Sequence, residues 1–346
     1  MPKATSLSFK PKQITKQLLS VLETRASDVI TSRFGLGKET ERQTLEAIGQ
    51  KYSITRERVR QIENSALQLI RKSDVYKKQM PAFDELKAFI HALGGVVGED
   101  NLLEEAAKDK SSQNHVHFML VVGEYFIRAK EDEEFKHRWH IDEDIASSIH
   151  DSLRKLYSSL SDQDLIPEAE MIEKFLSKVK DISEEHKDDE VARRWLSISK
   201  KIDKNELNEW GKAESPNVKA KGIRDYAFLV LRKHGSPIHF REVAKAIQQV
   251  FKKEAHIATT HNELIKDKRF VLVGRGLYAL TEWGYEGGVV KDVIRRLIEK
   301  YGPLTKQEVV EKVLKERYVK ENTIVVNLQN PKYFKKSKDG RYQVAK

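Results

Sequence analysis

The feature that most constrains the fold is a repeat that begins after residue 80. Three of the four tryptophans end similar phrases, at Trp139, Trp210 and Trp283, and their spacings are 71 and 73 residues. Another 63 residues follow Trp283, close to one more period. Self-similarity at a regular interval is typical of tandem copies of one small domain. We therefore expect four similar units in residues 81–346.

Each unit opens with an amphipathic helix that ends at a glycine, a natural helix C-cap. These helices are predicted at Phe83–Leu93, Ile223–His234 and Val290–Tyr301, and second helices at Asn101–Lys108, Phe240–Phe251 and Thr305–Lys315. The unit that starts near Ile145 matches less closely, with Ser161-Asp162 in place of the glycine.

The units close with strand-like segments around glycine turns. Arg269–Val273 and Leu277–Leu280 flank Gly274-Arg275-Gly276, and Tyr333–Lys336 and Arg341–Val344 flank Lys338-Asp339-Gly340. Asp-Gly between such segments is a strong hairpin signal. Helices followed by a hairpin predict winged helices. A helical protein with incidental hairpins is the alternative, but it does not explain the tryptophan period.

The predicted fold class is mainly α with small β-hairpins: an N-terminal helix-turn-helix followed by tandem winged-helix domains. The expected segments are a helix-turn-helix at 1–80 and winged helices at 81–141, 142–214, 222–287 and 288–346. Lys212–Lys221 is expected to be a linker, and Asp181–Glu190 a loop or a solvated helix end.

Composition excludes several classes of protein. The absence of cysteine rules out disulfides, thiol catalysis and cysteine-ligated zinc, and is typical of a reducing cytoplasm. No apolar run approaches the roughly 20 residues of a membrane span, and the N-terminus lacks the apolar stretch of a secretory signal. We expect a cytoplasmic protein with no membrane partner.

Charge is divided unevenly along the chain. Residues 1–80 contain 16 Lys and Arg against 8 Asp and Glu, residues 81–220 contain 20 against 31, and residues 221–346 contain 27 against 14. The two ends are basic and the middle is acidic, so a polyanion would be attracted to the ends and repelled by the middle. This asymmetry favours nucleic-acid contact at one end or both, although mixed charge is also common on ordinary solvated surfaces.

Residues 44–71 have the pattern of two helices around a tight turn. Leu45, Ile48 and Gly49 place apolar and small groups on one face of the first helix, and Ile54 lies in the turn. Thr55 is a predicted N-cap of the second helix. The predicted buried stripe of that helix consists of Val59, Ile62, Ala66 and Leu69.

Donor-rich side chains crowd the first two turns of this second helix, which enter the major groove in a helix-turn-helix. Arginine suits bidentate contact with guanine, glutamine with adenine, and glutamate can accept from cytosine. The predicted DNA-binding residues are Thr55, Arg56, Glu57, Arg58, Arg60 and Gln61. The alternative is an exposed helix with ion pairs along its surface.

Residues 29–71 resemble region 4 of the sigma-70 family of RNA polymerase sigma factors. The matching segments are Arg33–Leu36, Thr44–Glu46, Ile48–Gln50 and especially Thr55–Glu63. The resemblance implies that this helix recognises the −35 promoter element, with Arg56, Glu57 and Gln61 on bases and Arg58 and Arg60 on phosphates or bases. It also implies RNA polymerase core as a partner.

The chain departs from that family at Ser53, where the turn often has glycine, and at Ala47, where glutamate is frequent. No segment resembles the sigma regions that melt DNA, so a complete promoter-opening sigma factor is not expected. Residues 223–285 are similar to the HARE-type winged helix, a family that includes the N-terminal domain of the RNA polymerase delta subunit. That match does not distinguish a DNA partner from a protein partner. No family resemblance covers residues 81–210.

No catalytic, cofactor or metal site is predicted. His115, His117, His137 and His140 suggest zinc, but these spacings without cysteine or a carboxylate pattern are more typical of structural or solvated histidines. His239 and His261 are expected to be packing or capping groups. No helix follows Gly274-Arg275-Gly276, so it is not a phosphate loop. The Glu131–Glu134 run is expected to be a solvated loop or wing.

The sequence thus predicts a regulator that binds double-stranded DNA through its N-terminal segment. Protein contacts are expected at the acidic central units, and the basic C-terminal units would add backbone contacts, equally explained as solvated cations, through Arg275, Lys335, Lys336, Lys338 and Arg341. Two other classes stay open, a polymerase accessory subunit and an enzyme or defence protein that uses these modules for targeting. The sequence does not fix the oligomeric state.

Overall fold

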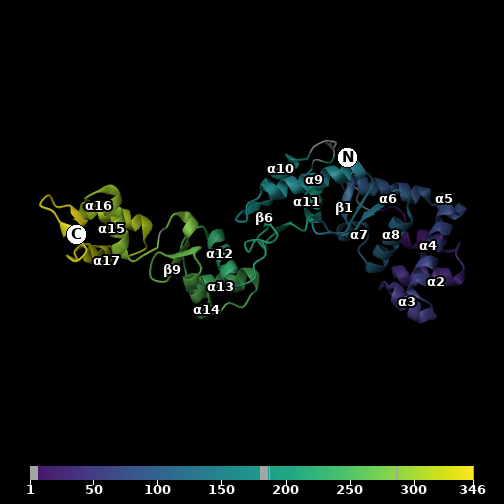
Figure 1. The fold of residues 1–346 in the computed structure, drawn as a ribbon, viewed down its shortest axis with the longest axis horizontal. Helices are drawn as coiled ribbons and strands as arrows, with labels where there is room; N and C mark the ends of the chain where they lie inside the picture. The colour runs from purple at the N-terminus through teal and green to yellow at the C-terminus, as the bar shows by residue number, and fades with distance from the viewer. Residues whose placement is uncertain (1–6, 180–185, 187, 286, 346) are drawn as a thin grey trace. The chain divides into compact units, whose positions relative to one another are not determined.

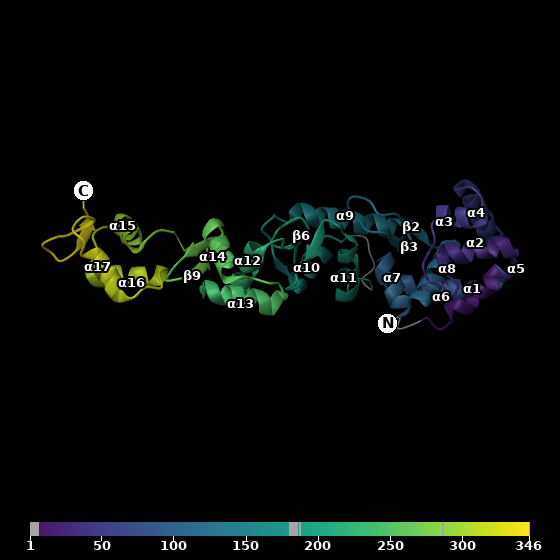
Figure 2. The ribbon, with the colours of Figure 1, turned by 90° about the horizontal axis from the view of Figure 1, so that it is seen from below.

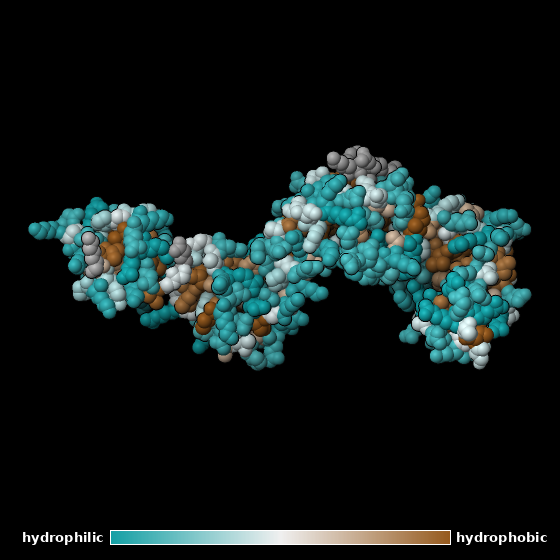
Figure 3. All heavy atoms as spheres, in the orientation of Figure 1, coloured by the Kyte–Doolittle hydropathy of each residue, from teal (hydrophilic) through white to brown (hydrophobic). Residues whose placement is uncertain are grey.

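The computed structural model describes residues 7–179, 186, 188–285 and 287–345. They form two compact units, an N-terminal unit of residues 1–214 and a C-terminal unit of residues 215–346. Both are mainly helical with small antiparallel sheets (Figure 1), as the sequence predicts. Hydrophilic side chains cover most of the visible face of each unit (Figure 3). Within the described ranges, no helix combines the length and apolarity that a membrane crossing needs.

The first helices of the N-terminal unit form a segment that we call the head. It consists of α1 (Pro11–Leu19), α2 (Thr24–Phe34), α3 (Leu45–Tyr52) and α4 (Arg56–Lys72). The short helix α5 (Asp74–Lys78) connects the head to the rest of the unit. Val29, Ile48 and Val59 are buried together at the centre of α2, α3 and α4, so the helix-turn-helix has its own small core.

One element order then occurs twice in the N-terminal unit. The first winged helix comprises α6 (Met80–Ala92), β1 (Val96–Gly98), α7 (Glu99–Ala106), α8 (Lys110–Val122), β2 (Ile127–Ala129) and β3 (Arg138–His140). The second comprises α9 (Glu143–Ser159), β4 (Ile166–Pro167), α10 (Glu168–Leu176), α11 (Asp189–Ile198), β5 (Ile202–Lys204) and β6 (Glu209–Lys212). In both sheets the last strand lies between the other two.

The same order occurs twice more in the C-terminal unit. The third winged helix comprises α12 (Ile223–His234), β7 (Ile238–His239), α13 (Phe240–Phe251), α14 (Ile257–Lys266), β8 (Phe270–Leu272) and β9 (Leu277–Leu280). The fourth comprises α15 (Val290–Tyr301), α16 (Lys306–Glu316), α17 (Glu321–Leu328), β10 (Phe334–Lys336) and β11 (Tyr342–Val344). Its first strand is reduced to a single bridge between Leu304 and Tyr342.

An aromatic residue at the centre of each sheet explains the repeat, although not in the way that the tryptophan spacing suggests. Trp139 pairs with Val97 and Arg128, and Trp210 pairs with Ile166 and Lys204. The residues at the matching position of the third and fourth winged helices are tyrosines. Tyr278 pairs with strand residues on both sides, and so does Tyr342, one of them through the single bridge.

Trp283 therefore does not correspond to Trp139 and Trp210. It lies in a 3₁₀ turn, η2 (Thr281–Trp283), after the last strand of the third winged helix. The structural interval between matching aromatics is 71, then 68, then 64 residues. Tryptophan and tyrosine both fill a half-buried position on a pleated sheet, so the repeat keeps the shape of the side chain and not its residue type.

The predicted stripe of α4 is wrong at its last residue. Val59 and Ala66 are buried and Ile62 is partly buried, but Leu69 is 57% exposed and Leu67 and Ile70 are buried instead. With 3.6 residues per turn, Ile70 lies only about 20° around the helix from Val59, whereas Leu69 lies about 80° away.

The third helices of the first two winged helices are buried against other parts of the N-terminal unit. Helix α8 lies against α1, α2 and α4 of the head (Figure 2), and every residue from Asn114 to Leu120 is buried. Helix α11 packs on β1, and Trp195 Nε1 donates to the Gly94 carbonyl at 3.1 Å. The head and the first winged helix share one core, in which Ile30 and Ile70 pack with Phe83 and Phe118.

The third helices of the C-terminal unit, α14 and α17, pack mainly within their own winged helices. They leave apolar side chains exposed, among them Ile265 at 62% and Val326 at 59%.

Two expected connecting segments differ in how far the structure describes them. In the proposed linker Lys212–Lys221, Ser215 and Asn217 are buried, so its middle is packed. In Asp181–Glu190, residues 181–185 and 187 lie outside the described residues, and α11 begins at Asp189 with Asp188 as its N-cap.

Candidate nucleic-acid interface

Two threonines and a left-handed turn set the geometry of the helix-turn-helix. Thr44 Oγ1 accepts from the Ala47 amide at 3.1 Å and begins α3, and Thr55 Oγ1 accepts from the Arg58 amide at 3.2 Å and begins α4, as predicted. Between them Ser53 has a φ of 52°, the conformation that ends α3. A side chain at Gly49 would place its Cβ 2.7 Å from the Ile54 carbonyl oxygen. Glycine therefore lets the turn approach α3.

All six predicted DNA-binding residues, Thr55, Arg56, Glu57, Arg58, Arg60 and Gln61, are exposed on the first turns of α4 or at its cap. They point away from the core because Val59 and Ile62 face it. Asn64, Ser65 and Gln68 are also exposed and extend this polar surface along the helix. Sequence reasoning omitted these three residues, although their position relative to Val59 and Ala66 already placed them on the polar side.

The side chains of this surface are partly paired with one another. Glu57 bonds Arg60 through both carboxylate oxygens, at 2.7 and 2.8 Å, and Arg58 donates to Gln61 Oε1 at 3.0 Å. The hydrogen bonds from Arg60 lower the pKa of Glu57, so its carboxylate is charged at neutral pH. Within the described part of the chain, the Arg56 guanidinium makes no hydrogen bond or ion pair.

This pairing fits the ion-paired alternative in part, but it does not occupy the donors. The pairs are solvent-exposed, and exposed ion pairs contribute little to stability, about 0–1 kcal/mol. Their atoms can exchange one another for base or phosphate atoms at small cost. The surface thus offers guanidinium and amide donors and one carboxylate acceptor, which are the groups that recognise base edges in the major groove.

Contacts from α8 and its C-terminal end hold the head in place. Asn114 Nδ2 donates to the carbonyls of Gly35, at 3.0 Å, and Thr40, at 2.7 Å, and its Oδ1 accepts from Arg42 Nε at 3.0 Å. Arg71, at the end of α4, donates to the carbonyls of Val121 and Val122 at 2.8 and 2.9 Å. The helix-turn-helix is therefore fixed at both ends on a buried helix, and its polar surface faces away from that platform.

The five candidate backbone-contact residues lie on the wings of the C-terminal unit, and all are exposed. Arg275 lies in the turn between β8 and β9. Lys335 and Lys336 lie on β10, and Lys338 and Arg341 lie in and after the following turn. Arg341 donates to the Pro303 carbonyl at 3.1 Å, so its guanidinium is partly held by the fourth winged helix.

The histidines singled out for zinc are not brought together into a metal site. Among the described residues, no group of three or more His, Asp or Glu side chains is arranged to hold a metal ion. His115, His117 and His140 are buried, while the His137 ring accepts from the Glu131 amide at 2.9 Å. Residues 131–134 form a loop before β3, where Glu131 and Glu134 pair with Lys200 and Arg154.

In the third winged helix, the histidines pack and cap as expected. His239 Nδ1 accepts from the Arg241 amide at 3.3 Å and N-caps α13, and its ring stacks on Phe240. Phe240 stacks in turn on His261, with ring centroids 4.2 Å apart. Gly276 has a φ of 71° and closes the β8–β9 turn, which confirms that this glycine pair belongs to a hairpin.

Two family models match this chain. Sigma-70, region 4 matches residues 18–72, and HARE-HTH, the helix-turn-helix domain of ASXL and restriction endonucleases, matches residues 223–283. Both resemblances inferred from the motifs are thereby confirmed. They cover the head and the third winged helix, while the first, second and fourth winged helices lie outside them.

Curated relatives match the head alone. The chain is 42% identical over 59 residues to the RNA polymerase sigma factor RpoD of Neisseria gonorrhoeae, which is 17% of this chain and 9% of that protein. It is 46% identical over 56 residues to the RNA polymerase sigma factor RpoD of Helicobacter pylori, 16% of this chain and 8% of that protein. The chain thus spans less than a tenth of these relatives. The matching families are helix-turn-helix DNA-binding domains and not enzyme families, which suggests a transcription-related role.

Proposed function

We propose that this protein is a transcription regulator whose head recognises a −35-like promoter sequence in the major groove. The observation that carries the proposal is the exposed donor-rich surface of α4, capped by Thr55 and presented by a rigidly anchored helix. In this proposal Arg56, Glu57 and Gln61 contact bases, and Arg58 and Arg60 contact phosphates or bases. The family match over residues 18–72 supports the proposal.

We further propose that the five segments predicted from the sequence act as distinct modules with different tasks. The first and second winged helices would be a platform for the head, since α8 and α11 are already covered by other parts of the N-terminal unit. The basic wings of the third and fourth would add backbone contacts. RNA polymerase core would be the protein partner, because the relatives of the head are polymerase sigma factors. Such a regulator would act in the cytoplasm, on the nucleoid.

The test is fluorescence anisotropy on full-length protein, with duplexes that carry a −35-like hexamer or a scrambled one. Arg56→Ala and Gln61→Ala should each lose about 1–3 kcal/mol on the hexamer, because each removes one base contact, and much less on the scrambled duplex. The control is Arg25→Ala, which removes an exposed arginine of α2 that lies outside this surface. Equal losses on both duplexes would contradict sequence recognition.

A second candidate is a polymerase accessory subunit whose modules mainly bind protein. The exposed apolar residues Ile257 and Ile265 on α14 and Val326 on α17 favour it, because DNA-contacting helices are usually polar and basic. A pull-down of purified core polymerase distinguishes the two candidates. Capture that survives Arg56→Ala and Gln61→Ala, with no preference for the hexamer in anisotropy, would favour the accessory subunit.

A further inference from the structure

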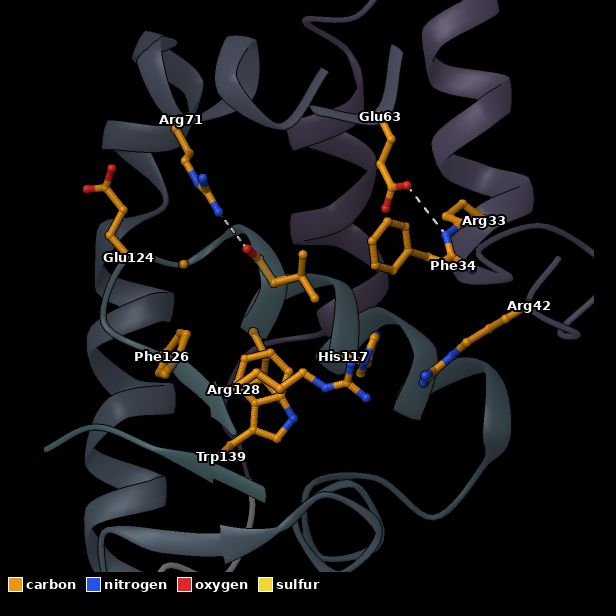
Figure 4. A pocket seen from close by; sticks show the side chains of 13 residues that line it. Arg33, Phe34, Arg42, Glu63, Arg71, His117, Glu124, Phe126, Arg128 and Trp139 are labelled. Carbon is orange, nitrogen blue, oxygen red and sulfur yellow. Dashed lines mark hydrogen bonds and ion pairs between the residues drawn. The ribbon is translucent and has the colours of Figure 1, made fainter. Parts of the chain in front are cut away.

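A cavity of about 690 Å³ lies between the head and the first winged helix, inside the N-terminal unit. Its walls include Arg33 of α2, Glu63 and Arg71 of α4, His117 of α8 and Arg128 of β2, together with Arg42 from the loop before α3 (Figure 4). Ligand pockets of folded proteins commonly have volumes of roughly 300–1,000 Å³, so this cavity has the size of a small-molecule site.

Four arginines line this cavity against two glutamates, and three of the arginines already have partners. Arg71 is bound to the Val121 and Val122 carbonyls, Arg33 lies 3.5 Å from Glu63, and Arg128 makes two bonds with Glu99 at 2.7 and 3.0 Å. Arg42 is different, because its buried Nη2 has no hydrogen-bond partner. Burial and the nearby Arg128 and Arg33 lower the pKa of Arg42, which indicates that positive charge is in excess there.

His117 is the second unsatisfied group. It is 6% exposed, and neither ring nitrogen has a hydrogen-bond partner, since the nearest carboxylate oxygen, on Glu99, is 3.8 Å away. In Figure 4 the guanidinium groups of Arg42 and Arg128 approach each other beside this ring. A buried donor left unpaired costs about 1–3 kcal/mol, so a ligand that accepts from Arg42 and His117 would recover that free energy.

We propose that this cavity binds a small molecule that carries two or more phosphate groups, of the nucleoside polyphosphate class. Several guanidinium groups around one cavity suit a multiply charged phosphate chain better than a single carboxylate, because each planar fork can bond two phosphate oxygens. The apolar wall made by Phe34, Phe126 and Trp139 would contact the rest of the molecule. A ligand there would join the head to the first winged helix.

The DNA proposed for the head would not fill this cavity at the same time. Glu63 and Arg71 line the cavity from the side of α4 that faces the first winged helix, whereas Arg56 and Gln61 lie on the exposed side. The proposal therefore stands or fails separately from recognition of a promoter sequence.

The experiment is isothermal titration of full-length protein with ATP and with inorganic pyrophosphate, at constant ionic strength, and with citrate as a carboxylate of similar charge. We expect saturable binding of ATP, weaker binding of pyrophosphate and none of citrate. Arg42→Met should weaken ATP binding at least tenfold, while Arg25→Met, which removes an exposed arginine from α2, should not change it. Equal binding by Arg42→Met and the unsubstituted protein, or equal binding of citrate, would overturn the proposal.

Two further arms keep the result interpretable. The melting temperature without ligand should not fall in Arg42→Lys, which keeps the charge and shortens the fork, so its loss of ATP affinity would report contact and not misfolding. A scrambled 20-base-pair duplex should not compete with ATP. Competition by that duplex would assign the cavity to a DNA phosphate and overturn the small-molecule proposal.

Discussion

Ser53 holds the turn of the helix-turn-helix in a left-handed conformation, with φ 52° and ψ 45°. Residues with a Cβ pay roughly 1–2 kcal/mol to adopt this region, whereas glycine adopts it freely. The conformation persists because α3 and α4 are both capped and their shared core fixes the angle between them. The departure from glycine noted in the sequence is therefore a strained position within a normal turn.

We expect Ser53→Gly to raise the free energy of unfolding by about 0.5–1 kcal/mol, the relief of that strain less the extra entropy of a glycine in the unfolded chain. Chemical denaturation followed by circular dichroism measures it. Ser65→Gly, at an exposed position inside α4, is the matched control and should lower stability by about 1 kcal/mol. A loss of stability in Ser53→Gly would contradict the assigned turn geometry.

His117 is a buried, neutral residue whose protonation is opposed by its surroundings. Burial and the positive charge of Arg42 lower its pKa to about 3, with Arg128 and Arg33 acting in the same direction and Glu99 in the opposite one. His150, which accepts from Arg138 Nε at 2.7 Å, has its pKa lowered to about 4, chiefly by burial. Both histidines are therefore unprotonated in the folded protein at pH 7.

The N-terminal unit should lose stability as the pH falls from about 6.5 towards 4. Over that range the unfolded chain takes up protons at these histidines and the folded chain does not, so protonation favours unfolding. For His117 the loss at pH 5 is about 2 kcal/mol. Denaturation midpoints at pH 7.5 and 5 measure it, and His117→Gln should show a shallower pH dependence. An unchanged pH dependence in His117→Gln would contradict a low pKa for this histidine.

Helix α8 occupies the position of the third helix of a winged helix, the one that contacts DNA in many such domains. Here its residues 114–120 are buried, and it carries the head. Asn114 makes three of the bonds that join the two, to Gly35, Thr40 and Arg42. The element has become a structural platform, which explains why an acidic unit lies next to a proposed DNA-binding one.

Asn114→Ala should lower the free energy of unfolding of the N-terminal unit by about 2–3 kcal/mol, because it leaves two buried carbonyls and one guanidinium without their partner. It should also speed hydrogen exchange in α3 and α4, measured by mass spectrometry, since the loop before α3 loses its anchor. Gln113→Ala, which removes a single bond to the Ala107 carbonyl on the same helix, should cost less and leave that exchange unchanged. Equal exchange in both variants would show that the head is anchored elsewhere.

At the scale of the whole molecule, basic residues belong to both ends of the chain and acidic residues to the middle. In the fourth winged helix, four of the cations are gathered on one hairpin, which has the single acid Asp339 among them. Such a wing can add phosphate contacts without adding sequence preference.

Neutralising this hairpin should therefore weaken binding of the −35-like and scrambled duplexes alike. The variant replaces the wing cations by glutamine at Lys335, Lys336, Lys338 and Arg341. The slope of log K against log salt should become shallower by about 0.9 for each phosphate that the wing no longer neutralises, as measured by anisotropy. The control removes four exposed lysines elsewhere in the same domain, Lys300, Lys306, Lys315 and Lys320. The same change of slope in both variants would mean that only net charge matters.

The sequence by itself determined the local features of this protein. Caps such as Thr55, apolar periodicity and glycine turns act over a few residues, so they predicted the helix-turn-helix, the bounds of α12, α13 and α15, and both C-terminal hairpins. They also identified a polar recognition surface, because the side chains opposite a buried stripe must face solvent.

Only the tertiary structure decided which surfaces remain free. Nothing local in Asn114 or Trp195 indicates that α8 and α11 are covered by neighbouring segments, because that burial depends on residues about 75 to 100 positions away. The arginine-lined cavity arises for the same reason, since its walls come from four separate helices and strands. Even the repeat needed strand register, which replaced Trp283 with Tyr278 as the partner of Trp139 and Trp210.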